Sequence, residues 1–260
     1  MAIFFSISNL DLNRSDRNIG FVNLSGNVTI SNIRFDNYQV NGQTNVGFLV
    51  GALFDKNLTL RNIMIENSTI VVTPAALEPD GNPYFPGNIG GLVGNARGSV
   101  NVENIIFKNS LIDTLSFEGP FLDGDTPKDL VRVGGLFGNA NFSGNITNAV
   151  VYPASEFGLI NSPAALGLNL SDNKYDNFSG DINTSKNIYS ANIIFEELTN
   201  VIKSNTNSYI DFKPTAKMKD INYFNSIGLN VSLKLNEELW YINQSINDGY
   251  PIISGFVISD

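Results

Sequence analysis

The sequence contains no cysteine and no histidine. Without cysteine the chain has no thiol nucleophile, no disulfide bond and no thiolate metal ligand, and it is compatible with passage through an oxidising compartment. Without histidine it lacks the commonest general base and metal ligand at neutral pH. These two absences remove the usual centres of nucleophilic and zinc-dependent catalysis, and we expect a protein that is not an enzyme.

Positive charge and long apolar runs are also scarce. The 260 residues include 16 Lys and Arg against 25 Asp and Glu, which gives a net charge of -9. This balance argues against binding to nucleic acids or anionic lipids, because those partners require clustered basic side chains. No apolar run reaches the roughly 18 residues of a membrane-spanning helix. We therefore expect no nucleic-acid partner and no direct membrane insertion.

The first residues do not form a signal peptide. Residues 1–5 lack a basic region and the necessary length, and residues 4–12 already alternate between apolar and polar side chains as a strand does. We interpret the chain as a fragment of a longer exported protein, and we expect the fragment to be monomeric.

Internal repetition is the most prominent positive feature. Residues 89–95 (IGGLVGN) recur as residues 133–139 (VGGLFGN), and weaker copies begin at residues 46 and 19. The spacings of 27, 43 and 44 residues between copies are typical of a solenoid, in which successive coils stack on one another. The repeat predicts an all-β solenoid.

The segment after each glycine motif predicts strands separated by a corner. Apolar residues alternate there in three copies, as Val28, Ile30, Ile33 and Phe35, then Leu58, Leu60, Ile63 and Ile65, then Val100, Val102, Ile105 and Phe107. The period of two indicates half-buried strands, and the single offset indicates a corner. Asn32, Asn62, Asn104 and Asn148 occupy that corner. Asparagine tolerates left-handed backbone angles, so we expect these four amides to form a ladder between coils.

The repeated glycines predict sharp turns or close approaches between backbones, because glycine has no Cβ atom. They are Gly47, Gly51, Gly90, Gly91, Gly94, Gly134, Gly135 and Gly138. Bulky residues at these positions are expected to clash.

Two insertions lengthen the later copies. Residues 73–88 and 113–132 have the composition of loops and account for the longer spacings. Insertions at the same point of successive coils emerge on one face of a solenoid, which is the first place to look for a binding surface. The ligand-contact candidates are their aromatic residues, Tyr84, Phe85, Phe117 and Phe121.

The repeat fades after residue 152. We divide the chain into repeat coils (1–152), degenerate coils and loops of the same solenoid (153–235), and a capping segment (236–260). Within the middle part, residues 188–194 resemble a degenerate coil and residues 220–235 show strand-like alternation. The last segment holds the only tryptophan, Trp240, and we expect it to cover the final coil, whose strand edges would otherwise promote aggregation.

The glycine motifs at 89–94 and 133–138, with the continuations 102–105 and 146–149, resemble the GLUG repeat of bacterial surface proteins. The segments 6–10 and 240–252 are similar to the strand before such repeats and to the tail that closes them. The resemblance covers about residues 6–152 and 236–254. It implies a right-handed parallel β-helix on a secreted or cell-surface protein, often an adhesin or a stalk module of one, and it transfers no catalytic residues.

Two carboxylate patterns suggest chemistry. Asp123 and Asp125 flank Gly124 in the second insertion, and such oxygen ligands suit Ca²⁺ in an extracellular module; the alternative is a solvated acidic loop, and no other cofactor is expected. Asp36 and Glu66 take equivalent positions on adjacent coils near Tyr38, a pattern that a glycan-active enzyme would use. The alternative is a solvent-facing position, since the next coil has Lys108 there.

We therefore predict a non-catalytic adhesin or stalk module at a bacterial cell surface or in the extracellular space. Its expected partner is a protein or glycan of a host or of a neighbouring cell. The alternatives are a polysaccharide lyase or hydrolase on a β-helix, and a tailspike-like receptor-binding protein.

Overall fold

The computed structural model describes residues 3–14, 18–23, 26–72, 88–113, 132–134, 136–152, 187–196 and 210–257. Within these residues the chain is mostly β-strand, and its helices are short. Three of the four sheets contain only parallel strand pairs. The all-β class that the sequence predicts is confirmed.

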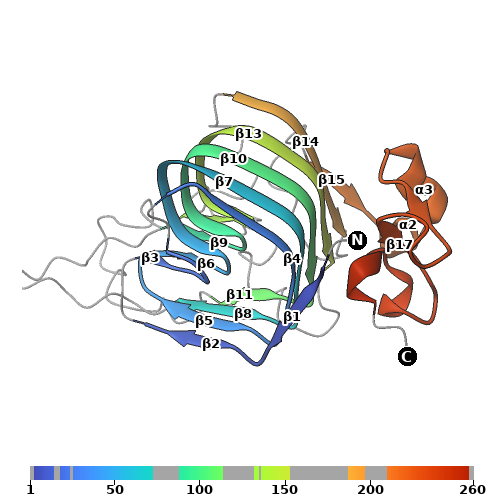
Figure 1. The fold of residues 1–260 in the computed structure, drawn as a ribbon, viewed down its shortest axis with the longest axis horizontal. Helices are drawn as coiled ribbons and strands as arrows, with labels where there is room; N and C mark the ends of the chain where they lie inside the picture. The colour runs from blue at the N-terminus through green and yellow to red at the C-terminus, as the bar shows by residue number, and fades with distance from the viewer. Residues whose placement is uncertain are drawn as a thin grey trace, which may run out of the picture.

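The three parallel sheets are visited in turn by the chain, and we call each passage through them a round (Figure 1). The long sheet contains β1 (Phe5–Ser8), β4 (Val28–Asp36), β7 (Val50–Glu66), β10 (Val93–Lys108), β13 (Phe137–Tyr152), β14 (Asn187–Glu196) and β15 (Ile210–Lys213), in that order. The second sheet contains β2 (Asp11–Asn13), β5 (Gln39–Gly42), β8 (Thr69–Val72) and β11 (Leu111–Asp113). The third contains β3 (Asn18–Ile19), β6 (Asn45–Gly47), β9 (Asn88–Gly90) and β12 (Arg132–Gly134).

The register between rounds follows the sequence repeat. Ile30 pairs with Leu60 and Leu60 with Val102, so equivalent apolar residues lie side by side. Their side chains fill one continuous core that the three sheets enclose. Alternation places one side of each strand in that core and the other side outward.

A second apolar cluster lies on the outer side of the long sheet. Met64, Ile106, Val150 and Ile194 point away from the enclosed core and pack against the C-terminal part of the chain. That part, which we call the C-terminal unit (residues 214–257), contains α2 (Thr215–Met218), α3 (Ile221–Ser226), β16 (Val231–Ser232), β17 (Trp240–Tyr241) and β18 (Ile252–Ile253), with 3-10 helices η4 (Asn247–Gly249) and η5 (Ser254–Phe256).

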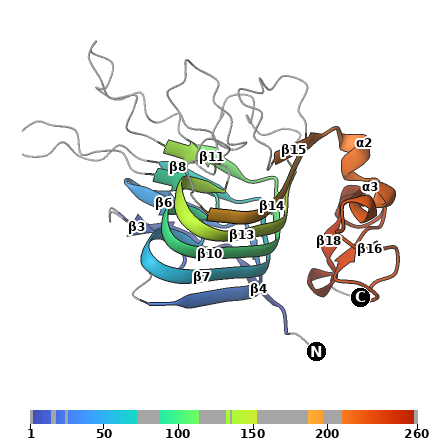
Figure 2. The ribbon, with the colours of Figure 1, turned by 90° about the horizontal axis from the view of Figure 1, so that it is seen from above.

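The C-terminal unit lies beside the stack of strands and does not cover its last round (Figure 2). Trp240 donates its indole N–H to Asn104 in the middle of the stack at 3.2 Å, and Phe256 packs edge-on against Phe4 next to the first strand, with ring centroids 5.0 Å apart. The expected position of residues 236–260 over the final coil is therefore wrong. The physical reason is the outward apolar row of the long sheet, which the C-terminal unit buries.

The described residues between 153 and 235 contain strands and short helices. Residues 188–194, expected to resemble a degenerate coil, belong to β14, which pairs with β13 and extends the long sheet. The strand-like alternation expected over residues 220–235 is wrong for residues 221–226, which form α3, and a strand is present only at β16. The Asp220 carboxylate accepts the N–H of Asn222 at 2.9 Å, and this N-terminal cap starts the helix, while Phe224 anchors it in the outer cluster.

Candidate functional site

The edge from which the two insertions leave the stack is the first part of the candidate site. The strands before them, β8 and β11, pair in parallel with Val71 opposite Asp113, and the strands after them, β9 and β12, pair with Asn88 opposite Arg132. In earlier rounds the same connections span only residues 14–17 and 43–44. Both insertions therefore begin and end at equivalent points of adjacent rounds, as the repeat spacing predicts.

The predicted ligand and metal residues lie outside the described residues. This holds for the aromatic candidates Tyr84, Phe85, Phe117 and Phe121, and for the calcium candidates Asp123 and Asp125. In the part of the chain that the structure describes, no group of three or more acidic side chains is placed to hold a metal ion. The ends of β8, β9, β11 and β12 thus show where the insertions that carry these residues join the sheets. The contacts of these residues remain a prediction.

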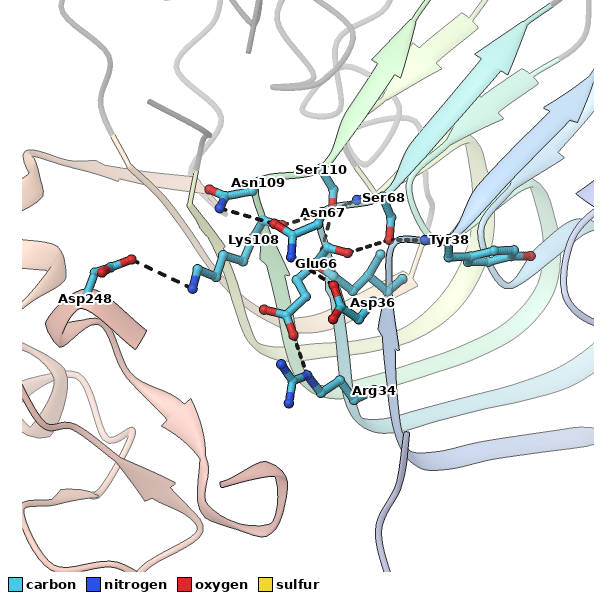
Figure 3. Close-up of polar contacts among 11 residues, drawn as sticks. Arg34, Asp36, Tyr38, Glu66, Asn67, Ser68, Lys108, Asn109, Ser110 and Asp248 are labelled. Carbon is cyan, nitrogen blue, oxygen red and sulfur yellow. Dashed lines mark hydrogen bonds and ion pairs between the residues drawn. The ribbon is translucent and has the colours of Figure 1, made fainter. Parts of the chain in front are cut away.

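The carboxylates Asp36 and Glu66 are neighbours on β4 and β7, and Lys108 continues the row on β10 (Figure 3). Glu66 is only 4% exposed, so a solvent-facing position is wrong for this residue. Its carboxylate is paired with Arg34. The buried carboxylate therefore has a cationic partner on the adjacent strand, which the sequence analysis did not identify.

Tyr38 does not provide the aromatic platform that a glycan-cleaving site would need. Its side chain is 1% exposed and its hydroxyl donates to the carbonyl oxygen of Phe48 at 3.0 Å. Burial raises the pKa of this phenol well above its usual value. The ring is stacked on Phe35 inside the enclosed core. The surroundings of Asp36, Glu66 and Tyr38 are therefore those of a structural turn in the chain.

Lys108 links this row to the C-terminal unit. Its ammonium group lies 3.9 Å from the carboxylate of Asp248. The next member of the row, Tyr152, is fully enclosed, donates its hydroxyl to the carbonyl oxygen of Pro251 and packs against the ring of Tyr250. Tyr250 in turn donates to Glu196 on β14 at 2.7 Å. Lys108 and Tyr152, together with Tyr250 and Glu196, therefore form the seam along which the C-terminal unit is held.

Burial governs the protonation of both seam tyrosines. It raises the pKa of Tyr152, and the nearby Tyr250 and Glu196 raise it further. Burial is also the main reason that the pKa of Tyr250 is raised, followed by its hydrogen bond to Glu196. Both phenols stay protonated and donate hydrogen bonds across the seam at neutral pH.

The predicted asparagine ladder is present at the corner of the long sheet. Asn62 donates to Asn32 at 2.8 Å, Asn104 to Asn62 at 3.0 Å and Asn148 to Asn104 at 3.0 Å. All four residues have positive φ angles between 52° and 58°. The corner position and the local amide chemistry thus agree with the prediction.

A second asparagine row turns the chain between the long and second sheets, and the sequence analysis missed it. Asn9, Asn37, Asn67 and Asn109 also have positive φ angles, and Ser68 and Ser110 beside them bond to the corner backbone (Figure 3). Three of these asparagines follow the first row by five residues, a regularity visible in the sequence. Across all rows, each Asn-to-Asn side-chain bond runs from the later round to the earlier one.

The repeat glycines permit close backbone approach. A Cβ atom on Gly94 would lie 2.5 Å from the carbonyl oxygens of both Gly51 and Asn88. Gly47, Gly51, Gly90 and Gly138 are crowded by backbone atoms in the same way, and none of them has a positive φ angle. Close approach is therefore their role, and Gly135 lies outside the described residues.

Comparisons with known proteins add no relative. No family model, no curated protein and no solved structure matches the chain. The described helices are also too short and too polar to cross a membrane. The candidate site therefore has to be interpreted from its own geometry.

Proposed function

We propose that the chain is a non-catalytic stalk or adhesin module of the GLUG-repeat type, built as a right-handed parallel β-helix. It is part of a bacterial surface or secreted protein, and its insertions at 73–88 and 113–132 contact a protein or glycan of a host or neighbouring cell. The observation that carries the proposal is the paired attachment of both insertions to adjacent rounds of parallel strands. A rigid scaffold that presents loops side by side is a common arrangement for binding.

The surroundings of the Asp36–Glu66 pair support the non-catalytic reading. A glycosidase needs an acid and a second carboxylate facing a sugar-binding groove with aromatic walls. Here Glu66 is bound to Arg34 and the nearby Tyr38 is buried. The polysaccharide lyase or hydrolase has no supporting constellation among the described residues.

A binding screen with shortened insertions tests the proposal. Residues 73–87 and 114–131 are each replaced by Gln-Thr, the connection found between β5 and β6. We expect the wild-type chain to bind one or more ligands on glycan and host-protein arrays, and the shortened chain to lose that binding while its circular dichroism spectrum is unchanged.

A matched control separates side-chain contact from loop length. Replacing Tyr84, Phe85, Phe117 and Phe121 by serine keeps both insertions and should weaken binding to the same ligand. Binding that survives both changes would show that another surface carries it. Release of reducing or unsaturated ends from a polysaccharide panel would favour the enzyme instead.

A further inference from the structure

The outer side of the long sheet has two halves, one on each side of the corner formed by Asn32, Asn62, Asn104 and Asn148. The half after the corner carries the apolar row that the C-terminal unit buries. In the half before the corner, the outward side chains are polar in every round from β4 to β13, and none of them is buried. We call this set the polar grid, and it consists of the odd-numbered residues of 27–31, 57–61, 99–103 and 143–147.

The polar grid is regular because the strands that carry it pair in parallel without a register shift between rounds (Figure 1). Thr59 pairs with Thr29 on one side and with Asn101 on the other, and Asn101 pairs with Asn145. Neighbouring side chains are therefore about 4.8 Å apart across the strands and about 6.8 Å apart along them. The amide of Asn145 donates to Asn101 at 3.3 Å. Amide and hydroxyl groups thus form a two-dimensional array.

The charge of the polar grid favours an uncharged partner. Its only charged members are Arg61 and Glu103, which pair with each other at 2.8 Å. The grid has a net charge of zero, whereas the whole chain carries -9. An anionic polymer would be repelled by the chain as a whole and would find no unpaired cation in the grid.

A β-bulge turns an aromatic ring outward next to the polar grid. Two residues of β7, Phe54 and Asp55, lie opposite the single Arg97 of β10, and Asp55 has a left-handed φ angle of 51°. Phe54 is 48% exposed, and the guanidinium group of Arg97 lies 6.0 Å from the centre of its ring. Bulges often redirect a side chain at a functional site, and an aromatic ring exposed to this extent adds little to the core.

We propose that the polar grid and Phe54 bind the surface of an insoluble neutral polysaccharide, in which extended sugar chains lie side by side as in cellulose or chitin. Amide and hydroxyl groups both donate and accept hydrogen bonds, as the hydroxyl groups of a sugar do. The exposed face of the Phe54 ring matches the apolar C–H face of a sugar ring. This site does not use the insertions, so it is separate from the binding surface proposed above.

The composition of the grid favours a polysaccharide over a protein partner. Protein interfaces are centred on apolar and aromatic side chains that are buried on binding. The polar grid contains no apolar side chain, and Phe54 lies at its border. A repeating array of hydrogen-bonding groups instead matches a polymer that presents the same groups at regular intervals.

Sedimentation of the full chain with powders of microcrystalline cellulose and of chitin tests the proposal. The wild type should leave the supernatant with at least one powder, and the two powders show whether N-acetyl groups are needed. The double variant Thr29→Glu with Asn101→Glu should lower the partition constant roughly tenfold or more, because two carboxylates would have to lose their water against a neutral surface. Phe54→Ser should also lower it.

The matched control adds the same two charges elsewhere. Asn222 and Gln244 are exposed on the C-terminal unit, and Asn222→Glu with Gln244→Glu should partition as the wild type does. Circular dichroism shows whether each variant is folded. All substituted side chains are exposed, so a loss of partition without a loss of structure is a direct readout.

Three results would overturn the proposal. The first is a wild-type chain that stays in the supernatant with both powders, even if it binds a soluble protein through Thr29 and Asn101. The second is equal partition of the wild type and the Thr29→Glu, Asn101→Glu variant. The third is loss of partition in the chain with shortened insertions, which would assign the binding to the insertions. Failure of the array screen for the insertions would leave the powder result unaffected.

Discussion

At the scale of single residues, Glu66 and Arg34 show how a buried charge is accommodated. The carboxylate is almost fully enclosed and its guanidinium partner is about one quarter exposed. Removing one partner of a buried pair leaves an uncompensated charge, which costs more than the pair itself contributes. We expect Glu66→Leu to lower the free energy of unfolding by about 2–3 kcal/mol in urea denaturation.

The same long sheet supplies the control for this prediction. Arg61 and Glu103 form a similar pair between adjacent strands, but their side chains are 56% and 44% exposed. Glu103→Leu should change stability by less than about 1 kcal/mol. The double variant Arg34→Met with Glu66→Leu should recover most of the loss, and equal losses in Glu66→Leu and Glu103→Leu would refute the burial explanation.

Asn104 combines three hydrogen bonds with a left-handed backbone. It donates to Asn62, accepts from Asn148 and from the indole of Trp240, and its φ angle is 56°. Asn104→Ala should destabilise by about 3 kcal/mol, since the lost bonds add to the roughly 1–2 kcal/mol cost of alanine in this conformation. Asn104→Gly removes the bonds without the backbone cost and should lose less. Thermal melts followed by tryptophan fluorescence measure both.

At the scale of elements, the repeat glycines let the backbones of adjacent rounds approach closely where the chain passes from the third sheet to the long sheet. Gly94→Ala would place a methyl group against two carbonyl oxygens of adjacent strands, and we expect a loss of roughly 1–3 kcal/mol or more. A Cβ atom on Gly26 would meet no other atom within 4 Å, so Gly26→Ala is the control and should leave stability unchanged or slightly higher. Equal melting temperatures for the two variants would contradict the role of close approach.

The strands and corners of the repeat could be predicted from the sequence because each round has the same types of residue at equivalent positions. Alternation gave the strands, and asparagine at a fixed offset gave the corners. The Arg34–Glu66 pair could not be predicted, since it depends on the register between residues 32 positions apart. The insertions could be placed at one edge, but their side chains lie beyond what the pattern determines.

The sequence also contains a pattern that indicates packing against the outer side of the long sheet, and a search for strict alternation does not detect it. Met64, Ile106 and Val150 each stand between two inward apolar residues, so three consecutive positions are apolar. A continuous apolar run indicates a strand buried on both faces. The helix α3 was not predicted because residues 220–235 show a strand-like alternation, and the capping role of Asp220, which favours a helix, was not considered.

At the scale of the whole molecule, the tyrosine seam predicts a loss of stability in alkali. The pKa values of Tyr152 and Tyr250 are raised in the folded state, so above pH 10 the unfolded chain loses protons that the folded chain keeps. The stabilisation is complete below pH 10 and declines as pH rises toward the folded pKa values. Melting temperatures between pH 8 and 12 should fall more steeply for the wild type than for Tyr250→Phe, and parallel curves would contradict the assignment.

The lateral position of the C-terminal unit also has a mechanical consequence. Hydrogen bonds between rounds run along the stack, so tension on its two ends would peel the rounds away one at a time, each releasing a contour length of about 3.3–3.6 Å per residue. The unit, however, touches Phe4 beside the first strand, Asn104 in β10 and Glu196 in β14. It therefore acts as a strap across the rounds, and a pulling force has to detach the strap before any round can unravel.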